Sequence, residues 1–82
     1  MKFKVGDRVR GEGEFDNVNL TNLTGTIKKV TDSLYSVEWD TKSNDFWNCS
    51  GYCNENSGYN CPARNLRLLT IDNWKAYMER EL

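Results

Sequence analysis

The sequence has no histidine, a single proline and no large excess of charge of either sign. Without histidine, the chain lacks the residue that most often activates a catalytic cysteine and that commonly ligates zinc. Eleven Lys and Arg residues stand against twelve Asp and Glu residues, so there is no basic field of the kind that drives binding to a phosphate backbone. These absences argue against an enzyme and leave a small binding domain as the expected class.

Long apolar runs are also missing. No stretch is long enough to span a bilayer or to serve as a signal peptide, so we expect no membrane association and a cytoplasmic location. Three cysteines, an odd number, fit a reducing compartment better than a disulfide framework. The 82 residues have room for one domain.

The strongest structural pattern runs over residues 24–40. Two β-rich runs flank Asp32-Ser33, which predicts an antiparallel hairpin. In the second run Tyr35, Val37 and Trp39 alternate with polar residues, so one face is expected to be buried and the other mostly wet. In the first run the apolar positions are out of step by one residue, and a β-bulge near residues 28–29 would restore the alternation.

Shorter patterns surround this hairpin. Residues 1–10 predict a first strand entered through a turn at residues 5–7, with Phe3, Val5 and Val9 facing inward. The loop at 11–23 is expected to fold onto the sheet through its four apolar side chains. Residues 62–65 predict a tight or 3₁₀ turn, followed by a closing strand at 66–69 in which Leu66 and Leu68 share one face. The four apolar residues of the loop at 11–23 are Phe15, Val18, Leu20 and Leu23.

The last thirteen residues predict a helix. Ile71, Trp74, Met78 and Leu82 recur at offsets of 3, 4 and 4, which makes a single apolar stripe. A helix of about three turns is marginal alone, so we expect residues 70–82 to pack on the preceding domain. A partner-facing or dimerising helix is the alternative.

Taken in order, the segments VGDRVR, GTI..V, YSVEWD and NLRLL resemble the strands of small SH3-like barrels, among them Mind-bomb type, KOW and Tudor-like modules. The resemblance covers residues 3–69. It implies one mainly β domain, a single SH3-like β-barrel of about five antiparallel strands at 1–69, to which the periodicity of residues 70–82 adds a C-terminal α-helix. It does not define a function, because such barrels bind proteins, peptides, modified histones and nucleic acids alike.

The connection at 41–63 departs from that pattern. It is longer and richer in cysteine than the usual link between the third and fourth strands, and from residue 46 to residue 63 its only charged side chain is Glu55. Exposed Trp and Tyr are the residue types that anchor interfaces. We therefore expect a partner-binding site on Phe46, Trp47, Tyr52 and Tyr59 of this connection, near Trp39. The alternative is that some of these rings cover an open end of the barrel.

The cysteines offer a weaker hypothesis. Cys49, Cys53 and Cys61 follow the spacing C-x₃-C-x₇-C, which contains one close pair of the kind that zinc sites use but no fourth Cys or His ligand. A Cys49–Cys53 or Cys53–Cys61 disulfide is a further alternative, and plain thiols are expected over both. We accordingly expect no metal and no cofactor.

Together these patterns predict a non-enzymatic binding module, an adaptor or an inhibitor of the kind that phages often encode, which contacts a protein partner through the aromatic connection. The competing hypothesis is nucleic-acid binding, with Trp47 or Tyr52 stacking on bases. The backbone would then be held by the basic residues Lys2, Lys4, Arg8, Arg10, Lys28 and Lys29.

Overall fold

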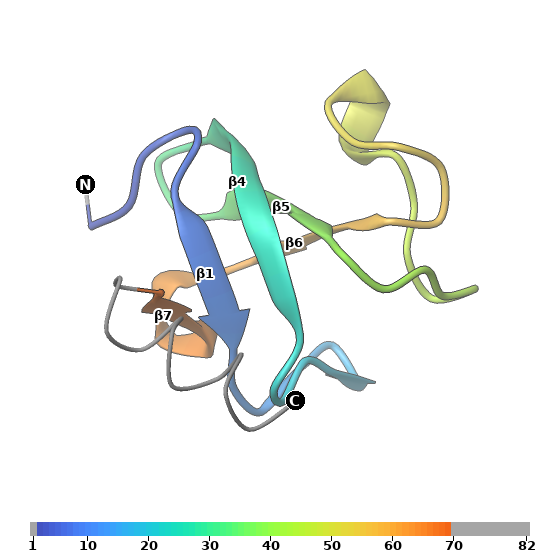
Figure 1. Ribbon diagram of the computed structural model, residues 1–82, viewed down its shortest axis with the longest axis horizontal. Helices are drawn as coiled ribbons and strands as arrows, with labels where there is room; N and C mark the ends of the chain where they lie inside the picture. The colour runs from blue at the N-terminus through green and yellow to red at the C-terminus, as the bar shows by residue number, and fades with distance from the viewer. Residues whose placement is uncertain (1, 70–82) are drawn as a thin grey trace, which may run out of the picture.

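The computed structural model describes residues 2–69, and these are mainly β-structure (Figure 1). A five-stranded antiparallel sheet has the order β6-β5-β4-β1-β7, and a two-stranded sheet pairs β2 with β3. The strands are β1 (Arg8–Gly11), β2 (Glu14–Phe15), β3 (Val18–Asn19), β4 (Thr24–Val30), β5 (Tyr35–Trp39), β6 (Gly58–Cys61) and β7 (Leu66–Leu68). Two 3₁₀ turns, η1 (Cys49–Gly51) and η2 (Ala63–Asn65), complete the described elements.

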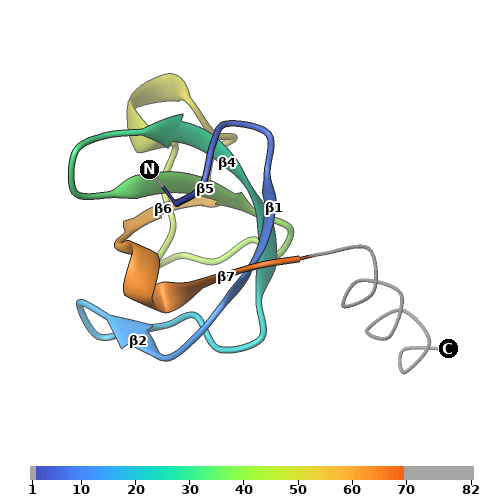
Figure 2. The same cartoon turned by 90° about the vertical axis from the view of Figure 1, so that its left-hand side faces the viewer.

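The five-stranded sheet curves around its core but does not close (Figure 2). Within residues 2–69, β6 and β7 are the two edges of the sheet, so the expectation of a closed barrel is wrong. Pro62 has no N–H to extend a ladder, and η2 follows it directly, which separates the end of β6 from the start of β7. The predicted helix at 70–82 lies outside the described residues.

The predicted hairpin is confirmed. β4 pairs with β5 from Gly25↔Trp39 to Val30↔Tyr35, and the register shifts between Ile27 and Lys29. The shift is the predicted bulge, and it keeps Ile27 on the buried face while the strand continues. Beyond it the chain turns at residues 31–34, where the Thr31 N–H donates to the Leu34 carbonyl at 2.9 Å.

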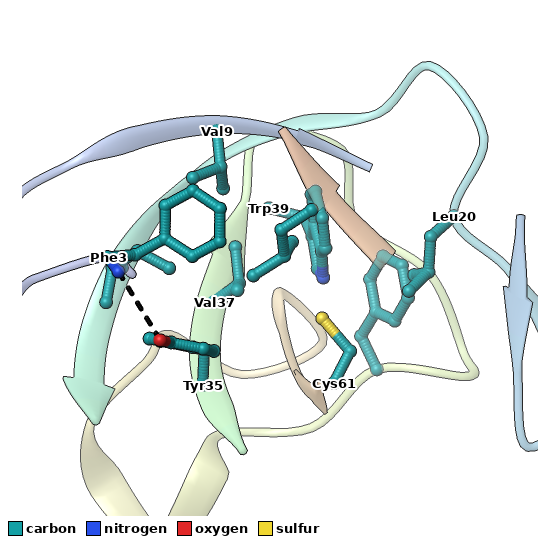
Figure 3. Close-up of a cluster of buried hydrophobic side chains, with 10 residues drawn as sticks. Phe3, Val9, Leu20, Tyr35, Val37, Trp39 and Cys61 are labelled. Carbon is teal, nitrogen blue, oxygen red and sulfur yellow. Dashed lines mark hydrogen bonds between the residues drawn. The ribbon is translucent and has the colours of Figure 1, made fainter. Parts of the chain in front are cut away.

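The core lies on the concave side of the curved sheet and takes side chains from every large segment (Figure 3). Tyr35, Val37 and Trp39 enter it from β5 as predicted, and the ring of Phe3 meets that of Tyr35 edge-on at 5.3 Å. The Tyr35 hydroxyl accepts hydrogen bonds from the N–H groups of Lys2 and Phe3. The buried cluster is Phe3, Val9, Leu20, Ile27, Tyr35, Val37, Trp39, Phe46, Cys61 and Leu66.

The inward prediction for Val5 is wrong. Val5 is 60% exposed because it lies in the turn before β1, where the Asp7 N–H reaches back to the Lys4 carbonyl. Leu66 is buried, whereas Leu68 is 44% exposed near the end of an edge strand.

The loop at 11–23 folds onto the sheet, as predicted, through Leu20 in the core and Phe15, Val18 and Leu23 packed against it. Its backbone is held by Asn65, which is buried in η2. The Asn65 side-chain amide donates to the carbonyls of Glu12 at 2.7 Å and Glu14 at 3.2 Å, and the main-chain carbonyl of Asn65 accepts from the Glu12 N–H.

Replacing Asn65 with Ala should therefore destabilise the domain by about 1–3 kcal/mol, because two carbonyls lose a buried donor. Arg64→Ala, at an exposed neighbouring position of the same turn, is the matched control and should cost less than about 1 kcal/mol. Urea unfolding of the three proteins measures the difference. Equal stability losses for the two variants would contradict the role given to Asn65.

Candidate functional site: the β5–β6 connection

The connection between β5 and β6, residues 40–57, begins at an ion pair. Arg8 holds the Asp40 carboxylate in a two-pronged contact, with Nη2 to Oδ2 at 2.6 Å and Nη1 to Oδ1 at 3.0 Å. The Thr24 hydroxyl donates to the same carboxylate at 2.7 Å. The hydrogen bond from Arg8 lowers the pKa of Asp40. The start of the connection is thereby tied to both β1 and β4.

Further along, the connection returns to the sheet edge. The Trp47 N–H donates to the Gly58 carbonyl at 2.8 Å, and the Gly58 N–H donates to the Trp47 carbonyl at 2.6 Å. The Asn54 N–H donates to the Glu38 carboxylate at 2.7 Å. These bonds fix the backbone of the connection along β6 and across the outer face of β5.

Between these anchors the chain makes the tight turn η1, which projects at the end of the molecule away from the β2–β3 hairpin (Figures 1 and 2). Cys49 and Ser50 have left-handed backbone angles, with φ of 50° and 58°. The Cys53 N–H closes the turn by donating to the Asn48 carbonyl at 2.9 Å. The turn places the side chains of Cys49 and Cys53 on the same spot of β6.

That spot is Gly58. A Cβ at this position would lie 2.6 Å from the Cys49 sulfur, 2.7 Å from the Cys53 Cβ and 2.8 Å from the Cys53 sulfur. The absence of a side chain is what lets the two thiols sit against the strand. Both are buried, and so is Ser36 on the neighbouring β5. The outer face of β5 was expected to be mostly wet, and here it is covered by this turn.

The five aromatic residues of the predicted site divide into three groups: buried, intermediate and exposed. Trp39 and Phe46 are buried in the core, 2% and 5% exposed, so neither presents a ring to a partner. Phe46 leaves the connection to pack against Tyr59, with ring centroids 5.9 Å apart. Their assignment to an exposed binding surface is wrong because the open side of the curved sheet needs apolar cover.

Tyr59 is intermediate. Its ring also meets Phe15 at 6.5 Å, and its hydroxyl donates to the Phe15 carbonyl at 3.3 Å. Burial raises the pKa of Tyr59. Its contacts join the 11–23 loop to the sheet, which is a structural role.

Trp47 and Tyr52 remain exposed, at 44% and 49%. In the sequence Trp47 precedes the turn η1 and Tyr52 follows it, and the ammonium of Lys29 lies 4.5 Å from the centroid of the Tyr52 ring. We call Trp47, Tyr52 and Lys29 the aromatic surface. Sequence reasoning missed Lys29 as part of it, because only the bulge and the fold of the connection bring β4 to Tyr52.

The thiols are weak candidates for catalysis. Burial raises the pKa of Cys49 to about 12 and that of Cys61 to about 12, and it raises the pKa of Cys53 as well. A cysteine nucleophile or metal ligand needs the thiolate, which these environments disfavour. Over residues 2–69, no three Cys, Asp or Glu side chains converge as a metal site.

The register explains why Cys61 stands apart from the other two. It pairs with Tyr35 and its side chain enters the core (Figure 3), whereas Gly58, three residues earlier, presents the opposite face of β6 to Cys49 and Cys53. Successive residues of a strand alternate between faces. The weak candidate set Cys49, Cys53 and Cys61 is thus split by the sheet.

Comparisons with protein-family models, with curated proteins and with solved structures found no match to this chain. Across residues 2–69, no helix has the length and apolar character that crossing a bilayer requires.

Gly58→Ala should cost about 1–3 kcal/mol, because the added methyl group overlaps the buried side chains of Cys49 and Cys53. Gly51→Ala is the control from the same connection. Gly51 has a φ of +98° but nothing within 4 Å of an added Cβ, so its cost is conformational only, about 1 kcal/mol. Chemical denaturation should rank the two variants in this order, and the reverse ranking would refute the close packing.

The Asp40 pKa predicts a pH dependence of stability. Because the folded-state pKa is lowered, the contribution of the pair is fully present above the unfolded value of about 3.9. It is lost as the pH falls through the folded-state pKa. Both side chains are partly exposed, which limits the effect to about 0.2–1 kcal/mol. Urea unfolding from pH 7 to pH 2.5 should show the advantage of the wild type over Asp40→Asn shrinking below about pH 4, and a constant difference would contradict it.

Proposed function

We propose that this chain is a non-enzymatic binding domain that contacts a protein partner through the aromatic surface, Trp47 and Tyr52 with Lys29. The observation that carries the proposal is the exposure of two large aromatic rings on one connection whose other aromatic residues are buried or half-buried. Trp and Tyr are enriched among the residues that dominate binding energy at protein interfaces. An adaptor or an inhibitor would work in this way, by occupying a surface of its partner.

The backbone behind the aromatic surface is ordered before any partner arrives. Trp47 is paired to Gly58 through two hydrogen bonds, and Asn48 donates to the Glu55 carboxylate at 3.0 Å across the turn. Tyr52 follows η1 and precedes a buried cysteine. A preformed surface loses less conformational entropy on binding than a flexible loop does, which supports a recognition role for these rings.

The strand order supports an SH3-like origin for the scaffold. Four strands follow one another across the sheet as β1-β4-β5-β6, and the last strand, β7, returns beside the first. A 3₁₀ turn precedes that last strand, as in the SH3 domains that the sequence resembles. We propose that the domain is an open variant of that fold in which side chains, rather than a hydrogen-bond ladder, close the gap between β6 and β7.

Charge pairing favours a protein partner over nucleic acid. Arg8 is engaged by Asp40, Arg10 lies 3.8 Å from Glu12 and Lys28 lies 3.9 Å from Glu38. Three of the six basic residues that a phosphate backbone would need therefore face a carboxylate. Affinity for a phosphate backbone depends on unpaired Lys and Arg side chains that displace counterions.

The thiols fit the same picture. Cys49, Cys53 and Cys61 carry no disulfide, which agrees with the cytoplasmic location proposed from the sequence. Their raised pKa values support a domain without cysteine catalysis.

Affinity capture from the native host tests the function. The wild-type chain, the Trp47→Ala/Tyr52→Ala double variant and a Val5→Ala/Leu68→Ala double variant are immobilised, and recovered proteins are quantified by mass spectrometry. Among residues 2–69, Val5 and Leu68 are the other exposed large apolar residues, so they control for nonspecific adhesion. We expect the aromatic variant alone to lose the partner, with a cost of about 2 kcal/mol or more, roughly 30-fold in affinity.

The same experiment is run after nuclease treatment and over a range of salt concentrations. Recovery of the same proteins by the aromatic variant would refute the assignment of the surface. Binding that is abolished by nuclease and falls steeply with salt would establish the nucleic-acid alternative instead.

A further inference from the structure

The proposed function leaves two buried thiols without a role, Cys49 in η1 and Cys53 two residues after it. Cys49 is 3% exposed and Cys53 is 7% exposed, and both sulfurs lie against the same point of β6. An added Cβ on Gly58 would be 2.6 Å from one sulfur and 2.8 Å from the other. The two sulfurs are therefore no further apart than the sum of those two short distances.

The backbone of the turn keeps the two residues together. The Tyr52 N–H donates to the Cys49 carbonyl at 3.3 Å, and the Cys53 N–H donates to the Asn48 carbonyl at 2.9 Å. Two cysteines whose backbones are already held close together need only side-chain rotation to reach the geometry of a disulfide. Cys61 is excluded from the pair because it points into the core from the opposite face of β6.

We infer that Cys49 and Cys53 form a peroxide-sensitive dithiol, which closes to an intramolecular disulfide on the outer face of the sheet. The inference goes beyond the proposed function and holds whether or not the aromatic surface binds a partner. Hydrogen peroxide is small enough to reach thiols that are almost completely buried.

Cys53 is the sulfur that reacts first. It is the more exposed of the two, and the adjacent Cys49 thiol acts to lower its pKa, which favours its thiolate. Lys28 acts in the same direction and Glu38 opposes it. Burial still raises the pKa of Cys53, so oxidation is expected to be slower than that of an exposed, activated thiol.

The reaction balances with hydrogen peroxide alone. The Cys53 sulfur attacks one peroxide oxygen, the O–O bond breaks, and the departing hydroxide takes the Cys53 proton to give water and a sulfenic acid. The Cys49 sulfur then attacks the Cys53 sulfur and the S–O bond breaks. The second hydroxide takes the Cys49 proton as water, so two thiols are oxidised to one disulfide while one peroxide is reduced to two waters.

Thiol counting on the folded chain tests the inference. Fully reduced protein is treated with hydrogen peroxide, quenched, denatured and alkylated with iodoacetamide, and its mass and peptide map are recorded. We expect a loss of two hydrogens, one alkylated cysteine in place of three, and a Cys49–Cys53 cross-linked peptide. Dithiothreitol should restore three alkylated cysteines.

Cys61→Ser is the matched control and should form the same cross-link, whereas Cys53→Ser should form none. Circular dichroism establishes that each variant is folded, and the peptide map of the wild type decides the question if a variant is not. Three thiols still alkylated after peroxide treatment would overturn the inference. So would a cross-link that contains Cys61 or that joins two chains.

Discussion

Burial of β5 on both of its faces is the constraint on which the rest of the described structure depends. Tyr35, Val37 and Trp39 fill the core on one face, while Ser36 on the other lies under the turn of the β5–β6 connection. A strand near the edge of a five-stranded sheet would otherwise have a wet outer face. The connection covers that face, which accounts for its length and for the small residues at the contact. Gly58 has no side chain, so two thiols can pack against β6. The Glu38 carboxylate accepts a hydrogen bond from the Asn54 backbone.

The same constraint decides which aromatic rings are exposed. Phe46 turns inward because the concave side of an open sheet needs apolar cover, and Tyr59 extends that cover to the 11–23 loop through Phe15. Trp47, one residue after Phe46, is then directed away from the core while its backbone pairs with Gly58. Tyr52 precedes a cysteine that is directed inward. Trp47 and Tyr52 are thus exposed because each is next to a residue, Phe46 or Cys53, whose side chain is buried, and neighbouring side chains along an extended chain point in opposite directions.

Much of the scaffold could be predicted from local patterns. The alternation in β5, the bulge in β4 and the 3₁₀ turn before β7 all depend on neighbouring residues, and each was found where the sequence indicated. Closure of the barrel could not be predicted in this way, because it depends on whether Pro62 and η2 allow β6 and β7, the two edge strands of the sheet, to pair with each other. The residues of the proposed binding surface were only partly predictable: composition identified the connection, but it could not separate Phe46, which packs against Tyr59, from Trp47, whose backbone pairs with Gly58 while its ring stays exposed. The sequence predicts no strand at residues 58–61, which fall in the inserted connection, so it could not show that β6 would form or that the thiols would approach Gly58.

The pairing of charged side chains bears on which kind of partner the proposed aromatic surface would bind. Arg8, Arg10, Lys28 and Arg67 each lie within 4 Å of a carboxylate, so interspersed charge in the sequence becomes paired charge in the fold. Lys29 differs, because the bulge at Ile27/Lys29 directs it toward the ring of Tyr52 rather than toward an acid. A cation held over an aromatic face remains charged and partly hydrated, and it adds a polar contact to an apolar anchor. Aromatic rings bordered by a single cation are a composition suited to a protein surface, whereas three of the six basic residues that a phosphate backbone would need lie beside a carboxylate.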